Sequence, residues 1–387
     1  MSVQISHKSA YAPIRYQSTR PWWKTLGKMA AEVVRIDGDF ARNDHFRKTF
    51  LPAVHKAFII EARIHPADRE VIDKELGLLS IKGRFIRGGR AIYDFSERLT
   101  DNLLMTDFSD TTIGDVLKSD LDIYIHFGAH PGLNLENTQY EGAWIEYLYE
   151  KKHLNIWPAK ANSFKSKPTK LSDDDSIDGI DYIAHSDEQT IASMFDGTMA
   201  QVRNAKNEML DETSDIIDDL AERTGIDPSD LIEDLFPNID EFSKAFESIH
   251  SSIFNICMSA LCYLNAKPEE TSYGWPKDAP VNMVAQAMNK KDAGRRATAQ
   301  TALENDGYIK IGYVGARYNT MSSEPRLFTP GQSASEIKHI KSTHPRRGFF
   351  RRQRVGQGRK DIKVVYVTPT MVNSGNKIGA GKVFAVK

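Results

Sequence analysis

The stretch DIYIHFGAHPGLNLENTQYEGAWIEYLYEKKHLNIWPA, at positions 122–159, decides the fold of this 387-residue chain. Three segments of it, DIYIHFG, AWIEYLYE and HLNIWPA, alternate in polarity and are rich in β-branched and aromatic residues. This pattern and composition are typical of β-strands. Because turn-like insertions separate the three segments, we expect an antiparallel meander. The stretch GIDYIAH, at positions 179–185, is expected to add another strand.

Helical patterns precede this sheet. The first, RPWWKTLGKMAAEVVRI at 20–36, places apolar residues on one face, and a second helix is expected over 46–60. A Gly-rich break is expected at GRFIRGGR, positions 83–90, followed by a third helical pattern over 91–105. The apolar face of this third pattern carries Ile92, Phe95, Leu99 and Leu103.

Helical patterns also follow the sheet. A long acidic helix is expected to end at Gly225, and a further helix restarts at 227–236. The helix over 241–264 has a continuous apolar stripe, which predicts a core helix; the stripe consists of Ile249, Ile253, Ile256, Cys257, Ala260, Leu261 and Leu264. One more helix-like stretch covers 284–306.

The fold class predicted from these elements is α+β, with a helical N-terminal part, a mainly antiparallel β-sheet, an acidic helical middle and a basic C-terminal β-hairpin module. The length suggests two or three units, and the pattern of elements along the chain divides it into four regions. They are a helical N-terminal region at 1–110, a sheet region with an acidic insertion at 111–197, a helical region at 198–305 and the basic module at 306–387.

Composition narrows the class of protein. The chain has no apolar run of the roughly 18 residues that a membrane span needs, and its N-terminus lacks the apolar centre of a secretory signal. We therefore expect a cytoplasmic protein with no membrane partner. The two cysteines, Cys257 and Cys262, have neither a zinc spacing nor a redox spacing and are expected in the core.

Charge is distributed unevenly although the net charge is −1. Residues 171–250 contain 22 acidic and 4 basic residues, whereas residues 335–387 contain 13 basic and 2 acidic residues. Such segregation indicates either that the basic segment faces a polyanion or that the two segments face each other. The sequence alone leaves both interpretations open.

No strong catalytic or cofactor motif is present. The sequence contains no Walker loop, no GxSxG, no HExxH and no CxxC pair, and we expect no cofactor and no bound metal. His126 and His130 are four residues apart, but FGAHPG is typical of a turn rather than of a metal-binding helix. His344, in the basic tail, is the one candidate for a general base of RNA cleavage.

The basic stretch HPRRGFFRRQRVGQGRKDIK, at positions 344–363, is the most informative feature. Gly356 and Gly358 predict a hairpin tip, where positive φ is needed. Arginines interleaved with aromatic rings suit RNA, since guanidinium groups hold phosphates and rings stack on bases. The predicted RNA or ribosome contacts are Arg346, Arg347, Phe350, Arg351, Arg352, Arg354, Arg359 and Lys360. In the alternative interpretation, one phenylalanine packs into the sheet and the arginines pair with the acidic middle.

Aromatic residues also gather in the predicted sheet. A few of them at a sheet edge could line a groove for an extended peptide. The candidates for this peptide groove are Tyr124, Trp144, Tyr147 and Trp157. The alternative is that these rings belong to the core.

The tail HPRRGFFRRQRVGQGRKDIKVVYVTPTMVNSG resembles the C-terminal signature of the type V-A anti-CRISPR family that acts on the biosynthesis of the CRISPR effector nuclease. The matching residues are His344, Arg346, Arg347, Gly348, Gly356, Gly358, Pro369, Val372, Asn373, Ser374 and Gly375. DIYIHF, NICMSALCYLNAKPEET and VNMVAQAMNKKDAGRRA resemble further parts of the family more weakly. The chain departs from the signature where the family has His-Trp, because Phe349 and Phe350 stand there.

The resemblance implies a function in counter-defence. Proteins of this family recognise the N-terminal segment of a nascent polypeptide, and loss of its mRNA follows. The partner implied here is therefore a nascent N-terminus, with a ribosome or RNA as a further partner. Because Phe349 stands where the family has the second histidine of its signature, the resemblance does not support a nuclease mechanism based on that histidine. The aromatic character is kept, so the resemblance still allows binding by stacking. Two rival hypotheses stay open, a ribonuclease that acts directly on mRNA and a plain RNA-binding regulator.

Overall fold

The structure is a computed structural model of the α+β class, as predicted. It describes residues 9–20, 26–27, 29–31, 48, 51–57, 69–135, 138–161, 163, 179–228, 239–316, 344–346, 348–368 and 370–372. Of the helix predicted over 20–36, only a few helical residues lie in these ranges, and the helix predicted over 46–60 is described as α3 (Leu51–Lys56). The acidic insertion expected in the sheet region, at 166–178, and nearly all of the helix expected over 227–236 lie outside the described residues.

A mainly antiparallel sheet forms the centre of the molecule. The meander is confirmed, because β6, β5, β4 and β2 pair in this order and antiparallel. Next to β2 come β1, β8 and β7, with β1 parallel to both of its neighbours. The strands are β1 (Ala91–Phe95), β2 (Leu121–His126), β3 (Asn134–Leu135, paired with β4), β4 (Thr138–Leu148), β5 (His153–Lys160), β6 (Ile180–Ile183), β7 (Thr271–Gly274) and β8 (Ile311–Val314).

The helix predicted over 91–105 is wrong in its first half. Residues Ala91–Phe95 form β1, and only α5 (Glu97–Leu104) is helical. The reason is tertiary, because AIYDF lies between β2 and β8 and pairs with both. Ile92 and Phe95, which share a face in a helix, contact opposite sides of the sheet. The break expected over 83–90 also begins later, since α4 (Arg69–Arg87) continues through Arg87.

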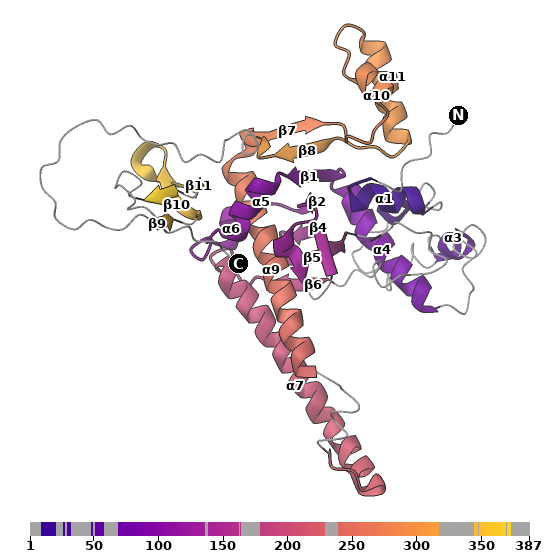
Figure 1. Ribbon diagram of the computed structural model, residues 1–387, viewed down its shortest axis with the longest axis vertical. Helices are drawn as coiled ribbons and strands as arrows, with labels where there is room; N and C mark the ends of the chain where they lie inside the picture. The colour runs from indigo at the N-terminus through magenta and orange to yellow at the C-terminus, as the bar shows by residue number, and fades with distance from the viewer. Residues whose placement is uncertain are drawn as a thin grey trace, which may run out of the picture.

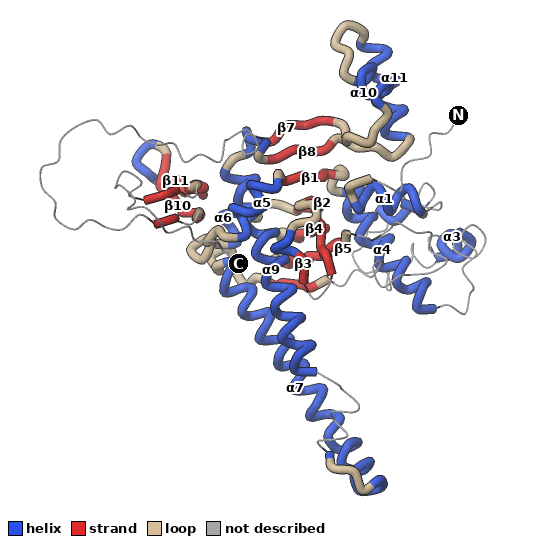
Figure 2. Tube along the Cα trace, in the orientation of Figure 1, coloured by secondary structure: helices blue, strands red, loops and turns tan. Residues whose placement is uncertain are grey.

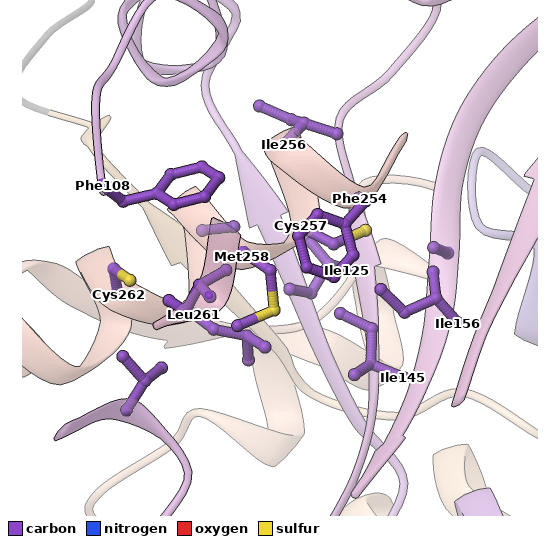
Figure 3. Close-up of a cluster of buried hydrophobic side chains, with 14 of the residues drawn as sticks. Phe108, Ile125, Ile145, Ile156, Phe254, Ile256, Cys257, Met258, Leu261 and Cys262 are labelled. Atoms are coloured by element: carbon purple, nitrogen blue, oxygen red, sulfur yellow. The ribbon is translucent and has the colours of Figure 1, made fainter. Parts of the chain in front are cut away.

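One face of the sheet is covered by α9 (Ile239–Ala266), together with α5 and the short α6 (Ile113–Val116). Figure 3 shows the apolar contact between α9 and the strands, including Ile125, Ile145 and Phe254. The predicted stripe of α9 is confirmed, with Ile253, Ile256, Cys257, Ala260 and Leu261 buried. Cys257 and Cys262 are buried free thiols, as expected.

A long acidic helix, α7 (Ile191–Thr224), lies against α9 and extends with it well beyond the sheet (Figure 1). Gly225 ends α7 as predicted: it is left-handed, with φ 70°, and its N–H donates to the Ala221 carbonyl. Thr190 caps the start of α7, because its hydroxyl accepts from the Ser193 N–H.

The opposite face of the sheet packs against α1 (Ala12–Thr19) and α4 (Figure 1). This interface contains buried ion pairs as well as apolar contacts. Arg15 of α1 lies 2.5 Å from Glu141, and Arg20 lies 3.0 Å from Glu75 of α4. Arg84 of α4 pairs with Glu146 of β4 at 2.9 Å.

The helix predicted over 284–306 is two helices, α10 (Val281–Ala287) and α11 (Ala293–Asn305). Asp292 separates them, because its carboxylate caps α11 by accepting from the Arg295 N–H. Figure 2 shows this helical pair extending from the ends of β7 and β8 at one edge of the sheet.

The central sheet takes strands from all four predicted regions. β1 comes from 1–110, β2 to β6 come from 111–197, β7 comes from 198–305 and β8 comes from 306–387. β8 therefore lies in the sheet rather than with the basic hairpin. Among the described residues, no helix is both long and apolar enough to cross a membrane.

Candidate functional site

The basic stretch forms the predicted hairpin. β10 (Phe349–Val355) pairs antiparallel with β11 (Asp361–Val367), and Val355 faces Asp361 across the end of the ladder. Gly356 and Gly358 have φ of 81° and 70°, so both have the positive φ expected of a hairpin tip. A short antiparallel pair, β9 (His344–Arg346) with β12 (Thr370–Val372), lies beside it in the sequence.

An apolar row attaches the hairpin to the protein. Phe350 faces Tyr366 across the two strands, with ring centroids 5.1 Å apart, and both side chains are buried. Tyr366 in turn contacts Tyr263 of α9, edge to face at 5.1 Å. Val364, two residues before Tyr366, is buried on the same side. The hairpin is therefore an extension of the core on the α9 face of the sheet.

Polar contacts fix the same attachment. The Phe350 N–H donates to the Asp107 carbonyl at 2.9 Å, and the Asp107 N–H donates to the Gly348 carbonyl at 3.2 Å. Arg352 Nε lies 2.9 Å from Asp115 Oδ2 on α6. Asp115 also completes a capping box with Thr112. We did not predict this partner from the sequence, although the spacing T-x-x-D at 112–115 signals a helix start.

The distal part of the hairpin is exposed and basic. Arg351, Arg354, Arg359, Lys360 and Lys363 are exposed side chains, and with the described residues none of them forms an ion pair. The Arg351 guanidinium donates a hydrogen bond to Gln353 at 3.2 Å. The arginines therefore do not pair with the described part of the acidic middle. Arg352 is the exception within the hairpin, and its partner Asp115 lies outside 171–250.

Phe350 does not lie on this exposed surface. Its side chain is only 3% exposed and packs on Tyr366, because alternation along β10 directs it towards α9. This placement corrects the expected stacking role and agrees with the alternative in which a phenylalanine packs into the core. Arg347 lies outside the described residues, and the side chains of His344 and Arg346 are likewise not described.

The four predicted peptide-binding residues do not form one open groove. Tyr124, Trp144 and Trp157 are cross-strand neighbours in a row on β2, β4 and β5, under α1 and α4. Tyr124 and Trp144 are fully buried there, 4.9 Å apart, and Trp157 is half-buried with Arg84 over its ring. Tyr147 is buried on the opposite face. These rings pack in the core because both faces of the sheet are covered by helices.

The histidines at 126 and 130 have separate structural roles. His126 is buried between Tyr11 and Tyr124, and burial together with Arg15 lowers its pKa to about 3. His130 Nε2 lies 2.8 Å from Asp101, and its Nδ1 accepts from the Gly132 N–H. In the described part of the chain, no group of three or more metal-ligating side chains comes together.

The fold and the hairpin define an α+β protein that presents an exposed basic ribbon fixed to its core. The model of the AcrVA2-like family, the anti-CRISPR type V subtype A2 family, matches residues 93–374. Because this span covers most of the chain, the chain belongs to that family of anti-CRISPR proteins and serves in counter-defence.

Among solved structures, the chain is similar to one described as the crystal structure of AcrVA2. The two share 14% sequence identity with a TM-score of 0.44, and the match covers 94% of this chain and 100% of the other. A search of curated proteins found no match.

Proposed function

We propose that this protein binds the nascent N-terminal peptide of a target polypeptide, a type V-A CRISPR effector nuclease, and thereby causes loss of the target's mRNA. Membership of the anti-CRISPR type V family supports the choice of target class. The observation that carries the proposal is the exposed basic surface of Arg351, Arg354, Arg359, Lys360 and Lys363 on a hairpin anchored in the core. A surface of this kind suits the RNA that surrounds a nascent chain.

The hairpin chemistry favours contact with phosphates rather than with bases. Phe350 is buried and Phe349 half-buried, so neither presents a free ring beside the exposed arginines. Guanidinium and ammonium groups bind the RNA backbone without reading its sequence. Selectivity for one target would then come from the peptide, while the hairpin holds the protein near the message or the ribosome.

A plain RNA-binding regulator is the second candidate, and the same exposed cations favour it. The two functions differ in what determines the target. A regulator that binds RNA alone acts independently of the encoded N-terminus, whereas a peptide-dependent protein stops acting when the N-terminal codons specify other residues.

The test uses bacterial cells that express the full chain together with an effector nuclease. We expect the target mRNA to fall, and the fall to disappear when the first twenty codons of the target are recoded to another peptide. Synonymous recoding of the same codons, which changes the RNA but not the peptide, should leave the effect intact. Loss of the effect on synonymous recoding would refute the peptide-dependent function and favour the regulator.

The role of the hairpin is tested with the quadruple variant R351E/R354E/R359E/K360E. The matched control, K151E/K290E/K291E/R295E, also reverses four exposed charges, in the turn between β4 and β5, at the start of α11 and in the turn before α11. We expect the hairpin variant to lose most of the activity and to bind RNA at least tenfold more weakly at low salt. Each lost phosphate contact should flatten the log–log salt dependence by about 0.7 on single strands. Equal losses in both variants would assign the effect to net charge alone.

A further inference from the structure

A hollow of about 260 Å³ opens on the α9 face of the sheet, apart from the exposed cations of the hairpin. It lies between the strands β1 and β2, the C-terminal part of α9 and the segment that joins α6 to β2. The residues that line it are Tyr93, Val116, Leu117, Lys118, Ser119, Leu121, Ile123, Leu261, Leu264 and Asn265.

The walls of the hollow are apolar, with a few polar groups. Six of the lining residues are valine, leucine or isoleucine, and the described part of the lining contains no carboxylate. Lys118, which is exposed, is the one charged side chain among the described residues that line the hollow. Asn265 is held in place, because its amide donates to the carbonyls of Val116 and Leu261 at 2.9 and 3.0 Å. The ligand that fits such walls has an apolar body and no positive charge beside Lys118.

Tyr93 forms a wall that continues to the edge of the sheet. Burial, and to a smaller extent a hydrogen bond with Tyr273 of β7, raises the pKa of Tyr93 to about 12. Both rings lie over Gly312, where a Cβ would come within 2.9 Å of Tyr93 and 3.2 Å of Tyr273. Tyr273 is 67% exposed, and β7 is the last strand on this side among the described residues (Figure 2). The hollow thus adjoins an exposed ring and a strand edge that can pair with an extended chain.

The size of the hollow limits the ligand to one large side chain. A cavity of about 150 Å³ is enough to bind benzene, whereas pockets for drug-sized ligands have roughly 300–1,000 Å³. A volume of about 260 Å³ therefore accommodates a methionine, leucine or phenylalanine side chain, but not a nucleotide cofactor.

We propose that this hollow binds a large apolar side chain at the start of the target peptide, with the peptide backbone passing along Tyr93 and Tyr273 towards the edge of β7. The identity of the peptide rests on the proposed function. Lys118 repels a free terminal ammonium, whereas a formylated terminus, as on a nascent bacterial chain, carries no charge. The hollow consequently prefers the formylated peptide.

The test measures fluorescence anisotropy of labelled synthetic peptides with the purified full chain. The probes are the first twenty residues of type V-A effector nucleases, each made with a formylated and with a free N-terminus. Leu264→Trp fills the hollow, and Asn255→Trp adds the same ring at an exposed position of the same helix. We expect Leu264→Trp to weaken binding at least tenfold and Asn255→Trp to leave it unchanged.

Lys118→Glu provides a second variant in an exposed segment, should Leu264→Trp fail to fold. It should reverse a several-fold preference of the wild-type chain for the formylated peptide. If the wild type binds a peptide and Leu264→Trp binds it equally well, the hollow is not the site, while the proposed function stands. If the wild type binds none of the peptides, the proposed function fails and this inference fails with it. Equal binding of formylated and free peptides by both wild type and Lys118→Glu would also overturn it.

Discussion

The two faces of the central sheet are built from the same strands but are stabilised differently. Along β2, Ile123 and Ile125 face α9, whereas Asp122, Tyr124 and His126 face α1 and α4. The α9 face is almost entirely apolar. The α1/α4 face combines aromatic rings with buried charges, and its carboxylates Asp122, Glu141 and Glu146 are all buried.

The two faces differ in how specific the contacts are that stabilise them. Apolar burial is non-directional and contributes roughly 25 cal/mol per Å², so the α9 face needs close packing but no particular partner for each side chain. A buried carboxylate needs a specific partner. Arg87 lies 2.8 Å from Asp122, whose pKa is nevertheless raised to about 6 by burial. On the same side, burial holds the pKa of Lys82 well below its usual range, and its Nζ donates a hydrogen bond to the Pro13 carbonyl. We therefore expect the α1/α4 face to be more sensitive to loss of one partner and more sensitive to pH.

The largest effect is expected from Arg15→Met. Arg15 is buried, pairs with Glu141 at 2.5 Å and donates to the carbonyls of Ser9, Ala10 and Ser163. Removing the guanidinium takes this ion pair away from the buried Glu141 carboxylate. In other proteins, the loss of one partner of a buried ion pair lowers the free energy of unfolding by about 3–5 kcal/mol, and we expect a similar loss here. Urea unfolding followed by circular dichroism measures the loss. The double variant Arg15→Met/Glu141→Leu should recover most of it, and a single-variant loss below about 1 kcal/mol would contradict the interpretation.

On the apolar face, Ile256→Ala should cost slightly less. Ile256 of α9 is fully buried in the apolar cluster of this face, and truncation to alanine removes apolar contacts and leaves a cavity. The expected loss is about 3 kcal/mol, with about 1 kcal/mol for Ile256→Val. The same urea experiment measures both variants. If both variants lost the same free energy of unfolding, the surrounding side chains would have to close the larger cavity that alanine leaves, which contradicts tight packing on this face.

We expect the contribution of the α1/α4 face to the free energy of unfolding to depend on pH, because this face contains His126. Its pKa of about 3 is depressed from the ordinary value of 6.5, so its contribution to stability is complete above about pH 6.5 and is lost as the pH falls towards 3. By pH 5, protonation of this histidine in the unfolded chain should lower the free energy of unfolding by on the order of 2 kcal/mol. His126→Phe, which keeps a ring against Tyr11, should remove this part of the acid destabilisation. Unfolding free energies at pH 7 and pH 5 test it, and parallel wild-type and variant profiles would refute it.

The smallest effect is expected at the hairpin, for Arg352→Gln. The Arg352 side chain is 35% exposed, so its pair with Asp115 is screened by solvent and contributes less than about 1 kcal/mol. Hydrogen exchange of the β11 amides should become faster without a change in global stability, and salt should reduce the difference. Arg354→Gln, at an exposed neighbouring position, is the control. Global destabilisation by Arg352→Gln would mean that the hairpin is a larger part of the core than its contacts indicate.

Local patterns in the sequence predicted most elements of the α9 face. The stripe of α9, the stop at Gly225 and the meander all depend on periodicity or on residues close in sequence. The hairpin tip was predicted from nearby residues too, because a tight turn needs positive φ and Gly356 and Gly358 adopt it without steric cost.

The α1/α4 face was not predictable in the same way. The partners of Glu141 and Asp122 are Arg15 and Arg87, which lie far away in the sequence and belong to different helices. The predicted peptide groove was misplaced because aromatic residues on a strand look alike whether a helix covers them or not. Tyr124 and Trp144 are covered, and only the packing of α1 and α4 reveals it.

By itself, the sequence determined the α+β class, the order of the meander, the apolar stripe of α9 and the conformation of the hairpin tip, since each depends on local periodicity or on backbone freedom. The tertiary structure decided that Ala91–Phe95 is a strand, that Phe350 is buried while Arg351 and Arg354 are exposed, and that Tyr93 meets Leu264 across a hollow. These outcomes depend on contacts between residues far apart in the chain, whose free energy overrides local propensity.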